Sequence, residues 1–277
     1  EKENGRWQLV MKVMVKDGCV TTRELTKAVA GALNRRMIPE KDTKTLIGKG
    51  VNLYTYEEEP RFQAIYGVAR MVKDGAAVSG DNFSFLEPES GKMVMCLSDG
   101  MGSGSLACKE SEMVIELVEK FLEAGFDVET AARMMNSAMV MKGQEDLFST
   151  VDISELDLYD GTCRFYKIGA AATFIRRNGI VECLISTSLP VGVSYKLDME
   201  KSEKDLYNGD FLVMVSDGVL EYLHVPNPEE TMQEIIESIE TNNATILAKR
   251  ILERVLLFTG GKAADDMTVL ATAIWEK

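Results

Sequence analysis

Two tight turns limit the folds open to this chain. Asp160-Gly161 interrupts the alternating segment VDISELDLYDGTCRFYKIG, and Asn178-Gly179 interrupts ATFIRRNGIVECLI. Asp-Gly and Asn-Gly between alternating strands are the strongest short-range signals of a β-hairpin, because these residues tolerate positive φ. The chain is therefore predicted to contain antiparallel sheets, which argues against a parallel, doubly wound fold.

Helical patterns occur in pairs on both sides of these hairpins. Apolar residues at helical spacing predict helices over 106–122 and 128–141 before them, and over 228–239 and 244–258 after them. Hairpins interrupted by helix pairs predict an α+β fold in which helices cover the sheets.

The N-terminal part reads as a separate, smaller α/β unit. It has one strand pattern at 7–15 and one helix pattern at 22–37, which Thr21 opens with the capping-box spacing. We predict a small regulatory or linker unit over 1–59 and a main domain over 60–277.

Two apolar strands of the main domain both end in Ser-Asp-Gly. Asp99 lies in MVMCLSDGMGSGS and Asp217 in FLVMVSDGVLEYL, while Asp81 and the pair Asp265 and Asp266 directly precede two further strands. If these strand ends converge, the carboxylates raise each other's pKa unless a cation lies between them. Mg²⁺ and Mn²⁺ prefer such oxygen ligands. The alternative is that the Asp-Gly pairs are ordinary turn residues.

Charge and composition exclude several classes of partner. The net charge of −13 disfavours nucleic acid. No apolar run reaches the roughly 20 residues that span a bilayer. The five cysteines form no Cys-x-x-Cys pair and are interpreted as reduced core residues of a cytoplasmic domain. Because the chain begins at Glu1, we expect a fragment from which an upstream membrane anchor could be missing.

In combination these motifs resemble a known family. SGDNF, LSDGMGSG, VSDGVLE and ADDMTV, in this order, resemble the metal-dependent protein phosphatases of the PPM (type 2C) family. The LPVG turn and Gly169 in KIGAAATF resemble the stage II sporulation protein E group of that family. The resemblance implies an αββα sandwich, with two antiparallel sheets between helix pairs and the metals at one end of the sheets.

The resemblance also implies roles for individual residues. Asp99 corresponds to the aspartate that bridges two metal ions, and the carbonyl of Gly100 to a ligand of one ion. Asp217 and Asp265 match the other carboxylates of the bridged site. Asp81 matches the acidic residue beside the second metal.

The sequence departs from the family pattern in two places. Gly80 stands where many relatives have Glu, which leaves the second metal short of a ligand. Arg70 and Lys73 are the nearest candidates for the arginine that holds phosphate in eukaryotic members, and neither aligns well. Asp266 stands where many relatives have Asn, so we expect it to support the metal ligands.

The implied function is hydrolysis of phosphoserine or phosphothreonine on a protein, with two Mn²⁺ or Mg²⁺ ions activating the attacking water. Asp99 and Asp217 would act catalytically through that water, with no Ser, Cys or His nucleophile. The substrate implied by the group is an anti-sigma-factor antagonist in sporulation or partner-switching regulation. The alternative is a pseudo-phosphatase that acts as a binding or signalling module.

A methionine-rich helix pattern, AARMMNSAMVMKG, suggests one contact surface in addition. Methionine packs adaptably and suits surfaces that accept a partner. A homodimer is therefore one option for the assembly of this chain, and the alternative is that these methionines only pack against the sheet.

Overall fold

The structure, a computed structural model, describes residues 2–3, 6–40, 43–87, 91–102, 104–141, 148–258 and 260–277. The chain separates into two compact units, Glu1–Pro60 and Arg61–Lys277.

The first unit is a small sheet packed on one helix. Its sheet has the order β1 (Lys2–Glu3), β2 (Arg6–Val15), β6 (Gly50–Glu58), β4 (Met37–Pro39), and β3 (Val20–Thr21) pairs with β5 (Leu46–Ile47). Helix α1 (Thr22–Leu33) opens with the predicted capping box between Thr21 and Glu24. It ends earlier than predicted, because Asn34 adopts a left-handed conformation with φ of 50° and Met37 enters β4.

The second unit contains two five-stranded sheets in which every pairing is antiparallel. The first has the order β14 (Glu200–Asp205), β11 (Thr162–Ile168), β10 (Ser149–Asp157), β9 (Lys92–Gly100), β8 (Asp81–Leu86). The second has the order β13 (Ile180–Leu184), β12 (Thr173–Arg177), β15 (Phe211–Val215), β16 (Met267–Glu276), β7 (Phe62–Met71). Both predicted hairpins are confirmed, since β10 pairs with β11 and β12 pairs with β13.

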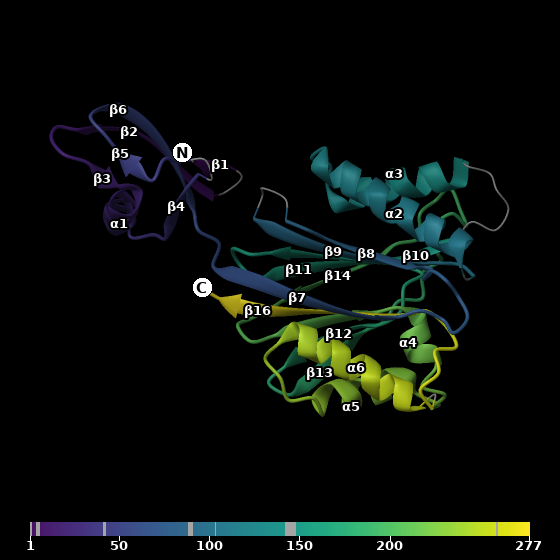
Figure 1. Ribbon diagram of the computed structural model, residues 1–277. Coiled ribbons are helices and arrows are strands. Elements are labelled where there is room, and N and C mark those ends of the chain that lie inside the picture. Colours follow the sequence, from purple (N-terminus) through teal and green to yellow (C-terminus); the bar gives the residue numbers. More distant parts are fainter. Residues whose placement is uncertain are drawn as a thin grey trace. The chain divides into compact units, whose positions relative to one another are not determined.

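Helices cover the outer face of each sheet in this unit (Figure 1). Helices α2 (Ser105–Glu123) and α3 (Val128–Met141) pack on the first sheet, and α5 (Pro228–Glu237) and α6 (Ala244–Phe258) on the second. The short helix α4 (Asp217–Glu221) follows β15 directly. One apolar cluster lies under each helix layer and a third lies between the sheets. The αββα sandwich is confirmed.

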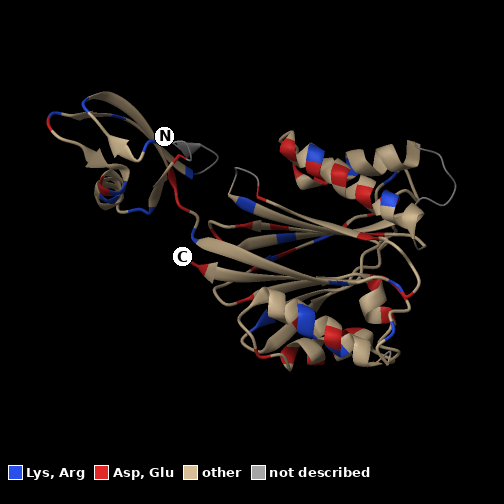
Figure 2. Ribbon diagram, viewed as in Figure 1, with Lys and Arg blue, Asp and Glu red and all other residues tan. Residues whose placement is uncertain are grey.

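Charged residues follow this layering. Those of both signs lie on the covering helices, whereas the strands between them are mostly uncharged (Figure 2).

None of the helices in the described ranges is long and apolar enough to cross a membrane. Cys96 and Cys163 are buried as predicted, but Cys19 is exposed, so the core interpretation is wrong for that residue.

The methionines of α3 divide between two environments. Met135 and Met139 are buried in the cluster under the helix layer. Met134 and Met141 are exposed by 38% and 79%. Only the second pair is available to a partner, and the homodimer stays a prediction.

Candidate active site

Three of the predicted carboxylates meet at one end of the sandwich. Asp81 begins β8 and is the cross-strand partner of Asp99 near the end of β9. Asp217 begins α4 directly after β15 of the other sheet, and its carboxyl contacts that of Asp99. The site is therefore shared between the two sheets.

Asp81 is the most unusual member of this group. It is 0% exposed, and neither carboxylate oxygen has a hydrogen-bond partner of good geometry among the described residues, although the hydroxyls of Thr268 and Ser216 lie close enough to lower its pKa. Buried carboxylates are normally paired with a cation or hydrogen-bonded, because burial without a partner costs free energy. The Asp81 carboxylate is thus a group that a bound cation would stabilise.

Burial and crowding perturb the titration of these groups. Burial, followed by the carboxyls of Asp217 and Asp81, raises the pKa of Asp99 to about 11. Burial also raises the pKa of Asp81 above its usual range; the hydroxyls of Thr268 and Ser216 partly oppose this shift, and the nearby Asp266 adds to it. A cation placed among these groups would favour their ionised forms instead.

The glycine of each Ser-Asp-Gly motif allows another part of the backbone to approach. A Cβ atom on Gly100 would lie 2.2 Å from the carbonyl oxygen of Ala107 in α2. A Cβ atom on Gly218 would lie 2.2 Å from the carbonyl oxygen of Asp266. The repeated motif therefore combines a strand-end carboxylate with a position that accepts only glycine. Ser103, within the first motif, lies outside the described residues.

The two carboxylates before β16 have different surroundings. Asp266 is buried and accepts hydrogen bonds from the backbone N–H groups of Lys73 (2.9 Å) and Gly80 (2.7 Å). Asp265 accepts from the N–H of Asp266 at 2.9 Å, and its Oδ1 lies 3.6 Å from Nζ of Lys73. Asp266 thus fixes the segment before β8. Asp265 lies close to Asp217, since its Cβ is 3.3 Å from the position of a Cβ atom on Gly218, but its carboxyl forms its ion pair with Lys73.

The positions that depart from the family pattern also have structural roles. A Cβ atom on Gly80 would lie 3.1 Å from Cβ of Ala107, so α2 packs closely against this glycine. Arg70 donates from Nη2 to the carbonyl oxygen of Asp81 at 2.6 Å, and its guanidinium lies 5.4 Å from the ring centroid of Phe83. Arg70 therefore ties β7 of one sheet to β8 of the other, next to the site.

Sequence reasoning missed two residues that connect α2 to β8. Asn82 donates from Nδ2 to Oγ of Ser111 at 2.8 Å and to the carbonyl of Cys108 at 3.1 Å. Ser111 in turn donates to the carbonyl of Gly80 at 2.5 Å. The sequence signal that could have indicated these contacts was Asn82, which directly follows Asp81 in SGDNF.

The donor chemistry fits a hard divalent cation. Carboxylates of Asp81, Asp99 and Asp217, together with the Gly100 carbonyl, are the oxygen ligands that Mg²⁺ and Mn²⁺ prefer. In the described part of the chain, no three side chains of His, Cys, Asp or Glu lie close enough together to coordinate a metal ion in their present positions. The fit therefore rests on the donor set and on the unpaired, buried carboxylate of Asp81.

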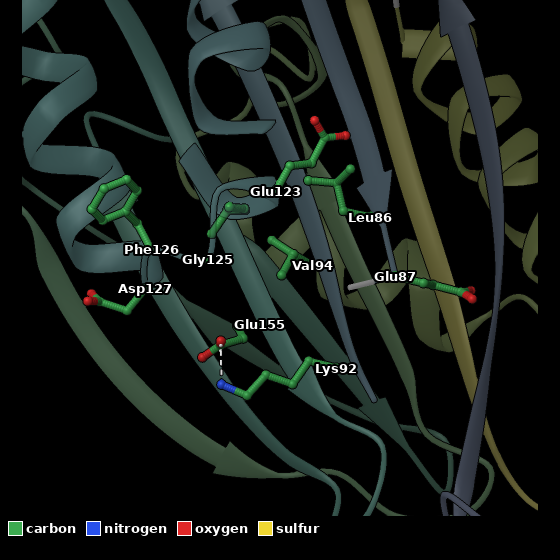
Figure 3. A pocket seen from close by; sticks show the side chains of 10 residues that line it. Leu86, Glu87, Lys92, Val94, Glu123, Gly125, Phe126, Asp127 and Glu155 are labelled. Atoms are coloured by element: carbon green, nitrogen blue, oxygen red, sulfur yellow. Dashed lines mark hydrogen bonds and ion pairs between the residues drawn. The ribbon is translucent and has the colours of Figure 1, made fainter. Parts of the chain in front are cut away.

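A cavity of about 630 Å³ lies at the opposite end of β9 (Figure 3). Lys92 crosses it to form an ion pair with Glu155 at 2.7 Å. The other lining residues are Leu86, Glu87, Val94, Leu122, Glu123, Gly125, Phe126 and Asp127. None of the predicted site residues lines this cavity.

Sequence comparisons find relatives over most of this chain. The profile of the family described as Stage II sporulation protein E (SpoIIE) matches residues 89–274. Stage II sporulation protein E of Bacillus subtilis (strain 168) is 30% identical over 273 residues, which are 98% of this chain and 33% of that protein. The chain thus spans about a third of the length of this relative.

Comparisons with solved structures identify the same fold. The PP2C phosphatase domain of Bacillus subtilis SpoIIE, solved with a fragment of its regulatory domain, has a TM-score of 0.81 and 28% identity, covering 100% of this chain and 81% of the other. A structure of RsbX in complex with magnesium has a TM-score of 0.59 and 21% identity, covering 79% of this chain and 98% of the other. The second likeness shows the fold alone.

Proposed function

Since the chain belongs to the stage II sporulation protein E family and has a PP2C-type serine/threonine phosphatase domain, we propose that it removes phosphate from phosphoserine or phosphothreonine of a protein through two bound Mn²⁺ or Mg²⁺ ions. The observation that carries this proposal is the meeting of Asp81, Asp99 and Asp217 at the junction of the two sheets.

In this proposal the chain holds the metal ions through oxygen atoms. The carboxylates of Asp81, Asp99 and Asp217 and the carbonyl of Gly100 hold them, and Asp265 joins the set if its side chain turns away from Lys73. When bound, such ions activate water as a nucleophile and neutralise the charge of phosphate oxygens.

Neighbouring residues keep these oxygens in place. Gly100 donates its N–H to the carbonyl of Gly80 at 3.3 Å, which holds the end of β9 beside the start of β8. The carboxylate of Asp266 accepts a hydrogen bond from the N–H of Gly80 at 2.7 Å, which fixes the position of Gly80. Phosphoryl transfer depends mainly on positioning and charge neutralisation. These backbone contacts are therefore the contribution of the fold to catalysis.

The reaction proposed here needs no side-chain nucleophile. His224 is the sole histidine of the chain, and it is exposed with its ring stacked edge-on to Tyr222 at 5.5 Å. Direct attack of water on phosphorus is consistent with this composition.

Family membership suggests the class of substrate. RsbX and RsbU of Bacillus subtilis, which match parts of this chain, are named phosphoserine phosphatases. We propose a small phosphoserine protein, an anti-sigma-factor antagonist, as the substrate, and a longer parent protein with a membrane region upstream.

The test is phosphate release from purified phosphoserine protein, with a phosphotyrosine peptide as the comparison substrate. We expect release from phosphoserine only, in the presence of Mn²⁺. Asp217→Asn should abolish it, whereas Asp160→Asn, which changes a hairpin-turn carboxylate, should not. A folded wild-type chain that binds the phosphoprotein and releases no phosphate would instead support the pseudo-phosphatase.

A further inference from the structure

The proposed site requires the two sheets to keep one fixed position relative to each other, and apolar packing alone does not provide this. Asp81, Asp99 and Gly100 belong to one sheet, while Asp217 follows a strand of the other. The space between the sheets is filled by apolar side chains such as Met95 and Met214. Apolar contact is non-directional, so it does not by itself fix one sheet in register with the other.

A buried polar cluster crosses this space. Asp152 of β10 and Lys167 of β11 are cross-strand partners with an ion pair of 2.5 Å, exposed by 2% and 3%. Thr173 of β12, in the opposite sheet, is 0% exposed. Its Oγ1 accepts from Lys167 Nζ at 2.8 Å and donates to Asp152 Oδ2 at 2.5 Å. The three side chains form a closed ring that includes both sheets.

This ring lies one layer beneath the carboxylates. Asp152 and Thr150 are two residues apart in β10 and face the same side of the sheet. Thr150 is the cross-strand partner of Asp99, and its Oγ1 accepts from the Asp99 N–H at 3.3 Å. In the other sheet, Thr173 is the cross-strand partner of Met214, three residues before Asp217. The ring therefore joins β10 and β12, which pair directly with the two strands that lead to the site, β9 and β15.

Stability alone does not account for a buried charge pair. Desolvating two ions costs about as much as their attraction returns, and apolar residues of similar volume often stabilise a protein as well or better. A directional, hydrogen-bonded ring does provide what apolar packing lacks, which is a fixed spacing between two particular strands.

We propose that Thr173, Asp152 and Lys167 are positioning residues, which hold the two sheets in the register that lets Asp99 and Asp217 share metal ions. This inference rests on the proposed metal-dependent function. Thr173 is the informative member, because it is the member contributed by the second sheet.

The test is Mn²⁺ binding by titration calorimetry, with Mn²⁺ alone as the ligand, in wild type, Thr173→Val and Thr173→Ser. Thr173→Val keeps the side-chain volume and removes the hydroxyl. Changes to groups that orient metal ligands typically weaken metal binding by about 10–100-fold, and we expect about tenfold here. Thr173→Ser should bind Mn²⁺ as wild type does, because it retains the hydroxyl.

Thr272→Val is the matched control. Thr272 is 1% exposed in β16 of the same sheet, and its Oγ1 lies 3.2 Å from Sδ of Met95 in the opposite sheet. Thr272→Val also removes a buried hydroxyl that contacts the opposite sheet, but Thr272 is not a member of the ring. We expect it to lower the unfolding temperature without weakening Mn²⁺ binding.

Two outcomes would overturn this inference alone, and a third would overturn it together with the proposed function. Mn²⁺ binding by Thr173→Val equal to that of wild type would show that the ring serves stability alone. Equal weakening by Thr173→Val and Thr272→Val would show a general effect of lost stability. A wild-type chain that binds no Mn²⁺ would instead refute the proposed metal-dependent function, and the positioning role with it.

Discussion

The substitution Asp81→Asn should make the metal-free protein more stable. The Asp81 carboxylate is 0% exposed, and its oxygens have no hydrogen-bond partner of good geometry among the described residues, although the hydroxyls of Thr268 and Ser216 lie nearby. Its raised pKa means that ionisation opposes folding, so its contribution to stability falls as pH rises above the pKa of the unfolded chain, about 4. Asparagine has the same shape and no charge, which removes this cost at neutral pH.

The expected gain is about 2 kcal/mol, because a buried charge without a cation costs more than the neutral amide that replaces it. For a domain of this size, 1 kcal/mol shifts the unfolding temperature by roughly 2–4 °C. We therefore expect Asp81→Asn to unfold about 4–8 °C above wild type in EDTA at pH 7.5. The difference should shrink as pH falls towards 4, because both proteins are then uncharged at this position.

Asp152→Asn provides the opposite case. Asp152 is 2% exposed, so its burial matches that of Asp81, but it is paired with Lys167. Removing one partner of a buried ion pair typically costs about 3–5 kcal/mol, because the other charge is left unpaired. Replacing Asp by Asn should thus raise the stability of the protein at position 81 and lower the stability of the protein at position 152. Loss of stability by Asp81→Asn in EDTA would refute the reasoning.

Three further predictions follow from the packing. Gly218→Ala should lower the unfolding temperature and weaken Mn²⁺ binding, because its Cβ would lie 2.2 Å from the carbonyl of Asp266; a mutant with unchanged calorimetric profiles would contradict this contact. Gly31→Ala should stabilise the first unit by about 0.5–1 kcal/mol in urea unfolding, since nothing lies within 4 Å of the added Cβ in α1. Residues 61–277 expressed alone should bind Mn²⁺ as the whole chain does, measured by calorimetry; a folded fragment without Mn²⁺ binding would place the first unit in the site.

Local signals predicted most of the fold. The bounds of α3 and α6 are as predicted, and Asp127 accepts from the N–H of Thr130 at 2.9 Å at the start of α3. The predicted helix at 22–37 extends too far, because its apolar pattern continues beyond Asn34 and a left-handed Asn is a weaker stop signal than Gly. Strand β14 was missed because EKSEKD has no apolar alternation to indicate a strand.

The site could be predicted only where the strand ends themselves specify it. Asp81, Asp99 and Asp217 terminate or precede apolar strands, so their convergence follows from sheet packing. For the adjacent Asp265 and Asp266, only the family resemblance assigned metal binding to the first and a supporting role to the second. Asp266 contacts the backbone of Lys73 and Gly80, which are distant in sequence, so local signals could not predict these contacts.

The buried ring under the site was also missing from the sequence interpretation. Lys167 and Asp152 occupy inward positions of alternating strands, where a charged residue reads only as an interruption of the apolar pattern. Their pairing depends on the register of β10 against β11, which no short-range signal specifies.

The central claim is that carboxylates shared between the two sheets hold the metal ions on which hydrolysis depends. Its most direct test is the rate of phosphate release from a phosphoserine protein as a function of Mn²⁺ concentration, in wild type and Asp99→Asn. We expect wild-type release to saturate with Mn²⁺ and to stop in EDTA, and a folded Asp99→Asn protein to release no phosphate at any Mn²⁺ concentration. Full turnover in EDTA, or by the Asp99→Asn protein, would contradict the account.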